Sequence, residues 1–310
     1  MLESLPCRRM QNRQDLITLW LMRWLAAMIV LLLILLVILL CKLALPAISK
    51  FGLGFILSDT WNPITEEFGA FPFIIGTLIT SFMALLMAAP LSVSVALFIC
   101  EICPKQLGRL LGTFVEMIAA VPSIVFGLWG IFSLAPWVQN VVTPFLKNTL
   151  GFLPFFQGPS YGIGVLTASL ILSIMITPTI CTFCREVFNT IPSQTKEAAL
   201  ALGATRFEMI KIAILKPSYS GMIAGIVLGL GRALGETMAV AMVIGNTSRL
   251  SLSIFAPGST MASVIANEYA EASNAIHLAS LGYIALLLLA ITLIINSFAR
   301  FIIWKWTPKI

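Results

Sequence analysis

The sequence predicts an all-α integral membrane protein with six transmembrane helices, and three observations lead to this prediction. First, 59% of the 310 residues are hydrophobic and only 10% are charged, and the mean hydropathy is +1.00, outside the range of soluble domains. Second, six apolar runs are long enough to cross a hydrocarbon layer about 30 Å thick. Third, the basic residues fall mainly on one side of a chain that alternates across the membrane.

The six apolar runs lie at 24–45, 76–99, 110–134, 162–183, 221–245 and 278–298. We retain the first as a helix rather than a cleavable signal peptide, because it exceeds the length of a signal h-region and no small-residue cleavage site follows it. No polar block is long enough to form a separate core. We therefore expect one membrane domain at 24–304, between cytoplasmic tails at 1–23 and 305–310.

The net charge of +6 is explained by membrane topology. Of the 19 Lys and Arg residues, fourteen would lie on one side of the membrane and Arg232 within a span. The other four, on the opposite side, are Lys42, Lys50, Lys147 and Arg249. Basic residues concentrate on the cytoplasmic side of membrane proteins. We therefore expect both termini in the cytoplasm and no nucleic-acid interface.

The first outward segment, at 46–75, contains the aromatic stretch SDTWNPITEEFGAFPF. Aromatic residues gather at membrane interfaces, so an interfacial belt is one interpretation and a docking surface for an outside partner is the other. His277, the only histidine, begins the last span on the same side and has no partner visible in the sequence.

Two prolines and one carboxylate interrupt the second and third spans. Pro90 and Pro122 predict a kink or hinge in each helix. Glu116 would lie about 9 Å into the third span by helical rise. Three states stay open for it: protonated, paired with a basic residue, or facing water near the cytoplasmic mouth.

Two C-x-x-C pairs have a spacing that also occurs in zinc sites. Cys100 and Cys103 form one pair, and Cys181 and Cys184 form the other. Both lie at the ends of apolar helices without the polar loops that usually build such sites. We therefore expect small buried side chains and no metal.

The longest cytoplasmic segment, at 190–217, predicts two short helices. Good helix formers run over 193–202, Gly203 stands where a C-terminal cap belongs, and Thr205 with Glu208 matches a capping box. The second helix would end near Leu215, before Pro217.

A DNA-binding helix-turn-helix is disfavoured for this segment because both of its ends are tethered to membrane helices. An amphipathic interface hairpin stays open, and a lever that presents a helix to a soluble partner is favoured.

The fifth span, 221–245, carries Arg232 and Glu236 in its middle. Arg232 would lie roughly 16 Å from Gly221, near the bilayer midplane, where an arginine costs about 2.5 to 3.5 kcal/mol. Such a helix usually faces other protein or water. Glu236 follows by four residues and could pair with Arg232.

The same span has a face of small residues, because every fourth residue is small. This face allows a neighbouring helix to approach closely. Its residues are Gly221, Gly225, Gly229, Ala233, Thr237, Ala241 and Gly245.

The segment EAALALG at 197–203, followed by an apolar stretch and Pro217, resembles the EAA loop of binding-protein-dependent ABC importer permeases. In that family the loop is a coupling helix that docks on the ATPase subunit, and the resemblance assigns this role here to Glu197, Ala198, Ala199 and Gly203. The stretches GLGRALGETMAVAMVIGN at 229–246 and WNPITEEFGAFPFIIGTL at 61–78 resemble the phosphate-specific branch of the family.

This resemblance implies a MetI-like type I importer permease of the bacterial cytoplasmic membrane that moves inorganic phosphate by alternating access. Its implied partners are a homologous PstA-like permease, two PstB-like ATPase subunits, a periplasmic PstS-like phosphate-binding protein and membrane lipid. The chain lacks the phosphate-binding pattern G-x-x-x-x-G-K-[ST]. ATP and magnesium are therefore expected on the partner ATPase, and this chain is expected to be neither an enzyme nor a cofactor carrier.

Within this resemblance, Arg232 and Glu236 are the expected residues of the substrate path, and Gly221, Gly225 and Gly229 are expected to pack helices. A cation offsets the desolvation of phosphate. Glu236 would hold Arg232 in place, or accept a hydrogen bond from protonated phosphate, which sulfate cannot donate; an ion pair that only locks the helices stays open.

Three other functions were weighed against phosphate import. A permease for another oxyanion, such as sulfate or molybdate, and a non-transporting phosphate sensor both stay open. An intramembrane enzyme is disfavoured, because no nucleophile with a base and no paired carboxylates converge in the sequence.

Overall fold

The computed structural model describes residues 13–306. Within them, six helices are long and apolar enough to cross a membrane: Leu16–Phe51, Phe71–Ile102, Ser123–Leu150, Val165–Asn189, Arg206–Leu234 and Ala275–Phe301. The predicted all-α fold with six spans is confirmed. The predicted tails fall partly outside the described residues, as do Arg8, Arg9 and Lys309, and the first helix already begins at Arg13.

The elements follow the chain in the order α1 (Arg13–Phe51), α2 (Gly54–Leu57), β1 (Trp61–Asn62), β2 (Glu67–Phe68), α3 (Phe71–Leu97), η1 (Phe98–Ile102), α4 (Lys105–Ala119), α5 (Ser123–Trp129), η2 (Gly130–Leu134), α6 (Ala135–Trp137), η3 (Val138–Val142), α7 (Thr143–Leu150), η4 (Pro154–Phe156), α8 (Val165–Asn189), α9 (Ser193–Ala201), α10 (Arg206–Met209), η5 (Ile210–Leu215), α11 (Lys216–Leu234), α12 (Met238–Val243), α13 (Met261–Glu268) and α14 (Ala275–Trp306). The strands β1 and β2 form one short antiparallel hairpin.

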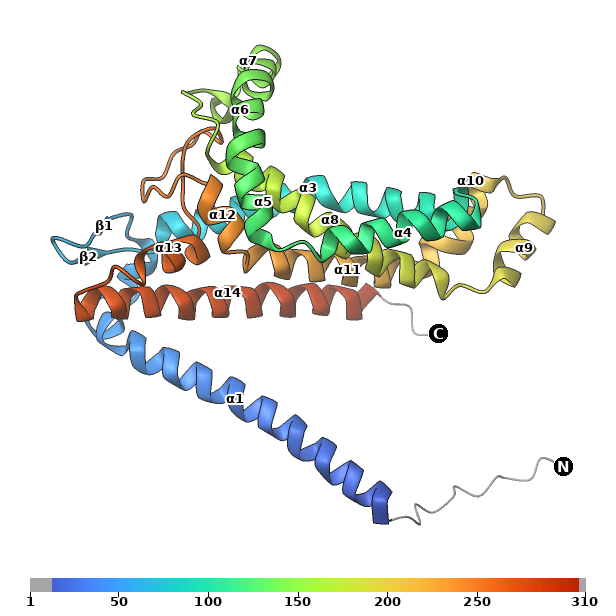
Figure 1. Cartoon of the computed structure of the whole chain (residues 1–310), viewed down its shortest axis with the longest axis horizontal. Coiled ribbons are helices and arrows are strands. Elements are labelled where there is room, and N and C mark those ends of the chain that lie inside the picture. Colours follow the sequence, from blue (N-terminus) through green and yellow to red (C-terminus); the bar gives the residue numbers. More distant parts are fainter. Residues whose placement is uncertain (1–12, 307–310) are drawn as a thin grey trace.

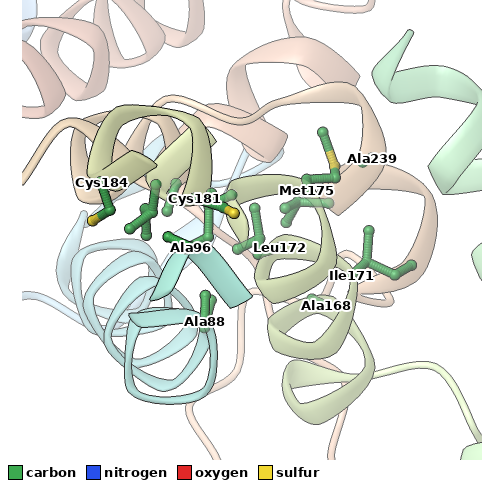
Figure 2. Packing of buried hydrophobic residues seen from close by; sticks show 14 of the residues in the cluster. Ala88, Ala96, Ala168, Ile171, Leu172, Met175, Cys181, Cys184 and Ala239 are labelled. Carbon is green, nitrogen blue, oxygen red and sulfur yellow. The ribbon is translucent and has the colours of Figure 1, made fainter. Parts of the chain in front are cut away.

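Helix α8 lies at the centre of the bundle, in contact with α3, α4 and α11. Figure 2 shows part of the core, where alanines of α3 lie near larger side chains of α8. Ala88 and Ala96 come from α3, and Leu172 and Met175 come from α8; all four are buried. Small residues on one helix let the backbones approach closely, which is how membrane helices gain packing energy.

A second core cluster closes the end of the bundle that carries the β1–β2 hairpin. Phe55 of α2 stacks on Tyr283 of α14, with ring centroids 4.5 Å apart and an interplanar angle of 12°. Helix α1 joins this cluster through buried Ala44 and Ala47 and then diverges from α14 (Figure 1). Residues 24–39 of α1 are exposed and apolar, as in a helix surrounded by lipid or by another subunit.

The third span differs from the predicted helix at 110–134. The chain forms α4, breaks at residues 120–122, and starts the spanning segment at Ser123. Pro122 has φ −59° and ψ 139°, which is extended rather than helical, and it stands immediately before α5. Proline disfavours helical geometry in the residue before it and supplies no N–H, so Pro122 breaks the helix instead of kinking it. Pro90, in contrast, lies inside a continuous α3.

The fifth span also differs from the predicted helix at 221–245. It begins at Arg206, and Pro217, which was predicted to end the preceding helix, lies in the first turn of α11 instead. The chain passes through Pro217 because the preceding segment η5 is π-helical, and such wider turns accommodate a missing backbone donor. The second helix of the loop at 190–217 and the fifth membrane helix are therefore continuous.

The same span ends early, at Leu234, and α12 follows after residues 235–237. Gly235 has low helix propensity, and the Thr237 hydroxyl donates a hydrogen bond to the Gly235 carbonyl oxygen at 3.2 Å, which competes with helical bonding. Arg232 thus lies in the last turn of α11, not in the middle of a longer helix.

The small face of α11 lies against α8 of the same chain. A Cβ atom on Gly221 would come within 2.6 Å of Val187, one on Gly225 within 2.9 Å of Phe183, and one on Gly229 within 2.6 Å of Ile180. These glycines therefore face a neighbour within this subunit, and the helix break ends the small face before Thr237.

We predict that Gly229→Ala destabilises the protein by about 1 to 3 kcal/mol, because the new methyl group would overlap the buried Ile180 side chain. Gly231→Ala is the matched control on the same helix, since its Cβ would have no neighbour closer than 3.7 Å. The measurement is the midpoint of thermal unfolding of the transporter in detergent. Equal midpoints for the two variants would contradict this account of the α8–α11 contact.

Candidate functional site

Arg232 is half-buried at the end of α11 and is held by a neutral partner. Its Nη1 donates a hydrogen bond to Thr179 Oγ1 at 2.9 Å. By helical rise, Thr179 stands about 15 Å along α8 from Asn189 and about 21 Å from Val165. The guanidinium therefore lies at the depth of the middle of α8, as expected for a charge deep within the membrane.

A cavity of about 850 Å³ opens beside Arg232 between α8, α11 and α14. Its polar lining consists of Thr179, Arg232, Thr292, Asn296, Ser297 and Arg300, and none of its lining residues is acidic. Two guanidinium groups, hydroxyl groups and one amide can donate hydrogen bonds to the oxygens of an anion. The arrangement suits a small oxyanion, which gains from cations that no carboxylate neutralises.

Glu236 lies apart from this cavity, in the break between α11 and α12. Its Oε1 accepts a hydrogen bond from the backbone N–H of Ala239 at 3.4 Å. Among the described residues no ion pair joins Arg232 to Glu236, so the pairing that the sequence allows is not observed. The helix break is the reason, because a spacing of four residues aligns side chains only within a continuous helix.

The loop at 190–217 has the predicted turn chemistry. Gly203 has φ +87°, and the capping box between Thr205 and Glu208 is confirmed, with both of its hydrogen bonds present. A left-handed φ favours glycine, while a Cβ there would meet nothing within 4 Å. Backbone geometry rather than space is therefore the constraint at Gly203.

Helix α9 is tied to the membrane domain on one face and open on the other. Lys196 Nζ lies 2.5 Å from Glu101 Oε1 of η1, and Ala199 packs against the main core. Glu197 and Ala198 are exposed. Leu202 is 90% exposed and Phe207 is 75% exposed, which is unusual for large apolar side chains next to a turn. The loop therefore exposes large apolar side chains on either side of Gly203.

The structure also tests the predictions for Glu116 and for the two cysteine pairs. Glu116 lies on α4 and pairs with Arg185 of α8, so the paired state is the one observed. Cys181 and Cys184 are buried in the main core, as expected. Cys100 and Cys103 are only partly buried, so the expectation of buried side chains is wrong for that pair. No group of three or more potential metal ligands occurs within residues 13–306.

At the opposite end, His277 has a partner that the sequence did not reveal. Its Nε2 lies 2.9 Å from Glu268 Oε2, and the same carboxylate accepts a hydrogen bond from Trp61 Nε1. The Phe68 ring stacks on the imidazole with centroids 5.3 Å apart. The aromatic residues of the first outward segment thus form a packed cluster with α13 and α14.

Sequence reasoning identified Arg232 but missed the residues that share its cavity. A signal for them exists in the last span, where Thr292, Asn296 and Arg300 recur every four residues in an otherwise apolar helix. Arg300 was counted with the cytoplasmic basic residues, which concealed its place beside Arg232.

Residues 103–305 match the family model described as binding-protein-dependent transport system inner membrane component. The phosphate transport system permease protein PstC of Mesorhizobium japonicum is 44% identical over 84% of this chain and 80% of its own length. The PstC protein of Pasteurella multocida is 44% identical over 85% of this chain and 83% of its own length.

More distant comparisons agree on the fold. The probable phosphate transport system permease protein PstC of Methanocaldococcus jannaschii is 37% identical over 86% of each chain. A solved chain of the MetNI methionine ABC transporter, in an inward-facing conformation, aligns with a TM-score of 0.55 at 16% identity, over 79% of this chain and 99% of that one. The chain therefore belongs to the family of binding-protein-dependent transport system inner membrane components, within its PstC branch.

Proposed function

We propose that this chain is the membrane-spanning subunit of an ATP-driven importer that carries inorganic phosphate into the cell by alternating access. The observation that carries the proposal is Arg232, which lies at mid-membrane depth on a cavity without acidic residues. The phosphate transport role named for the PstC relatives supports phosphate as the anion.

The energetics of the cavity fit transport rather than tight binding. At an effective dielectric constant near 20 and a separation of about 4 Å, each unit of anion charge gains roughly 4 kcal/mol from a guanidinium. This attraction offsets the desolvation of phosphate. Because a conducting site must also release its ion, a modest number of contacts is favourable.

ATP hydrolysis by a partner subunit is proposed to drive this chain through the EAA loop. In this proposal Glu197, Ala198, Ala199 and Gly203, together with exposed Leu202, dock on a PstB-like ATPase that holds ATP and magnesium. The ion pair between Lys196 and Glu101 would transmit movement of α9 to α3. A P-loop is lacking from the sequence, which supports an external energy source.

The surrounding assembly follows from the same proposal. A PstA-like permease would cover the exposed apolar face of α1, and a PstS-like protein would deliver phosphate at the end of the bundle that carries the β1–β2 hairpin. Helices α9 and α10, the start of α1 and the end of α14 lie toward the other end (Figure 1). The distribution of basic residues supports a cytoplasmic location for that end, in a bacterial inner membrane.

We expect Arg232→Gln to reduce phosphate uptake at least tenfold, because the cavity loses its mid-membrane cation. Thr179→Val is the matched control: it removes the partner of Arg232 Nη1 but keeps the charge, and should reduce uptake less. The measurement is uptake of labelled phosphate by a deletion strain that expresses the complete transporter, with membrane insertion checked in parallel. Competition with sulfate and molybdate identifies the anion, and wild-type uptake by Arg232→Gln would refute the role of Arg232.

Glu236 is proposed to accept a hydrogen bond from protonated phosphate as the anion passes the helix break. Glu236→Gln should lower phosphate uptake about tenfold, since a hydrogen bond to a charged group contributes roughly 1.5 to 3 kcal/mol. The substituted amide retains an oxygen for the Ala239 N–H, so α12 keeps its local contact. Unchanged phosphate transport by assembled Glu236→Gln would eliminate this role.

Gly203→Val should uncouple ATP hydrolysis from uptake. A β-branched residue at φ +87° is strained by about 1 to 2 kcal/mol, so the turn that aims α9 would change. Gly203→Asn is the control, because asparagine tolerates left-handed geometry. The measurement is the ratio of phosphate transported to ATP hydrolysed in proteoliposomes; an equal ratio in both variants would argue against coupling through this turn.

A further inference from the structure

A polar stripe on α14 faces Arg232 across the cavity. Thr292, Asn296 and Arg300 are spaced by four residues and all line the same wall, together with Ser297. The neighbouring lining residue Leu293 and most of the span are apolar. A helix exposed only to lipid would have no reason to carry this stripe, because unsatisfied polar groups are costly in hydrocarbon.

Asn296 lies next to the turn of α11 that carries Arg232. A Cβ atom on Gly231 would stand 3.7 Å from Asn296 Oδ1 and 3.8 Å from Nδ2, so the glycine leaves the amide uncovered. Arg300 follows one helical turn later, about 6 Å further along α14. That direction leads away from the hairpin end and toward the end that carries α9 and α10 (Figure 1).

We infer that Asn296 and Arg300 form a second oxyanion position, which receives the transported anion from Arg232 and passes it toward the EAA-loop side. This inference rests on the proposed function and adds the release half of the path. A single deep cation would hold the anion, whereas a second cation on the same cavity, one turn of α14 beyond Asn296, provides the next site, as conduction requires. The Asn296 amide can donate to the anion between the two guanidiniums.

Another explanation for Arg300 is an interfacial anchor whose guanidinium contacts lipid phosphates. The two explanations differ in what they require of the side chain. An anchor needs any cation near this end of α14, and Lys305 is an exposed cation on the same helix. A path residue must line the cavity, as Arg300 does and as Lys305 does not.

The test compares Arg300→Gln with Lys305→Gln in the complete transporter, reconstituted with its partner subunits in proteoliposomes. Initial rates of phosphate uptake are measured over a range of phosphate concentrations. Arg300→Gln should lower kcat for uptake about tenfold with less than a twofold change in KM, because entry past Arg232 is intact and release is slowed. Lys305→Gln should match the wild type, and Arg300→Lys should retain more of the rate than Arg300→Gln.

Two variants of Asn296 and a comparison of transported oxyanions complete the test. Asn296→Asp adds a carboxylate to the path and should lower kcat more than Asn296→Gln. Equal rates for Arg300→Gln and wild type, or equal losses in Arg300→Gln and Lys305→Gln, would overturn the inference. If the wild-type transporter carries sulfate or molybdate instead of phosphate, the proposed substrate is wrong, and the same comparison with that oxyanion still decides the role of Arg300.

Discussion

The close contact between α8 and α11 is the constraint on which the rest of the structure depends. Glycines at 221, 225 and 229 bring the two backbones together, and this contact sets Arg232 opposite Thr179. Because α10, η5 and α11 are continuous, the same contact also connects the EAA loop to the cavity without an intervening joint. In a membrane, where burial of apolar surface does not drive helix association, such packing has to supply the stability.

The break in the fifth span satisfies its own backbone groups locally. Backbone N–H and C=O groups freed at a break are costly in hydrocarbon unless they find other partners. In the fifth span those partners are local: the Thr237 hydroxyl bonds the Gly235 carbonyl oxygen and the Glu236 carboxylate bonds the Ala239 N–H. The break thus ends the helix just beyond Arg232, between the cavity and the hairpin end of the bundle.

The six spans could be predicted from local composition, because hydropathy over about 20 residues depends on the sequence of the span alone. The helix breaks could not, since the effect of a proline depends on its surroundings: Pro122 breaks a helix, whereas Pro217 follows a π-helical segment and is accommodated. Arg232 could be predicted because an apolar run made it conspicuous. Arg300 stands near a membrane boundary, where arginines are common, and only the folded chain places it beside Arg232.

In the proposed path, the partner of Arg232 would let a cation be held in position and still attract an anion. A carboxylate partner would fix the guanidinium and also cancel most of its field, leaving little attraction for an anion. Thr179 accepts a hydrogen bond but carries no charge, so it orients Nη1 while the positive charge remains available. The helix break also leaves the charge of Arg232 available, because Glu236 is not in the position where a continuous helix would pair it with Arg232. A neutral partner and a displaced carboxylate together keep the cavity positive.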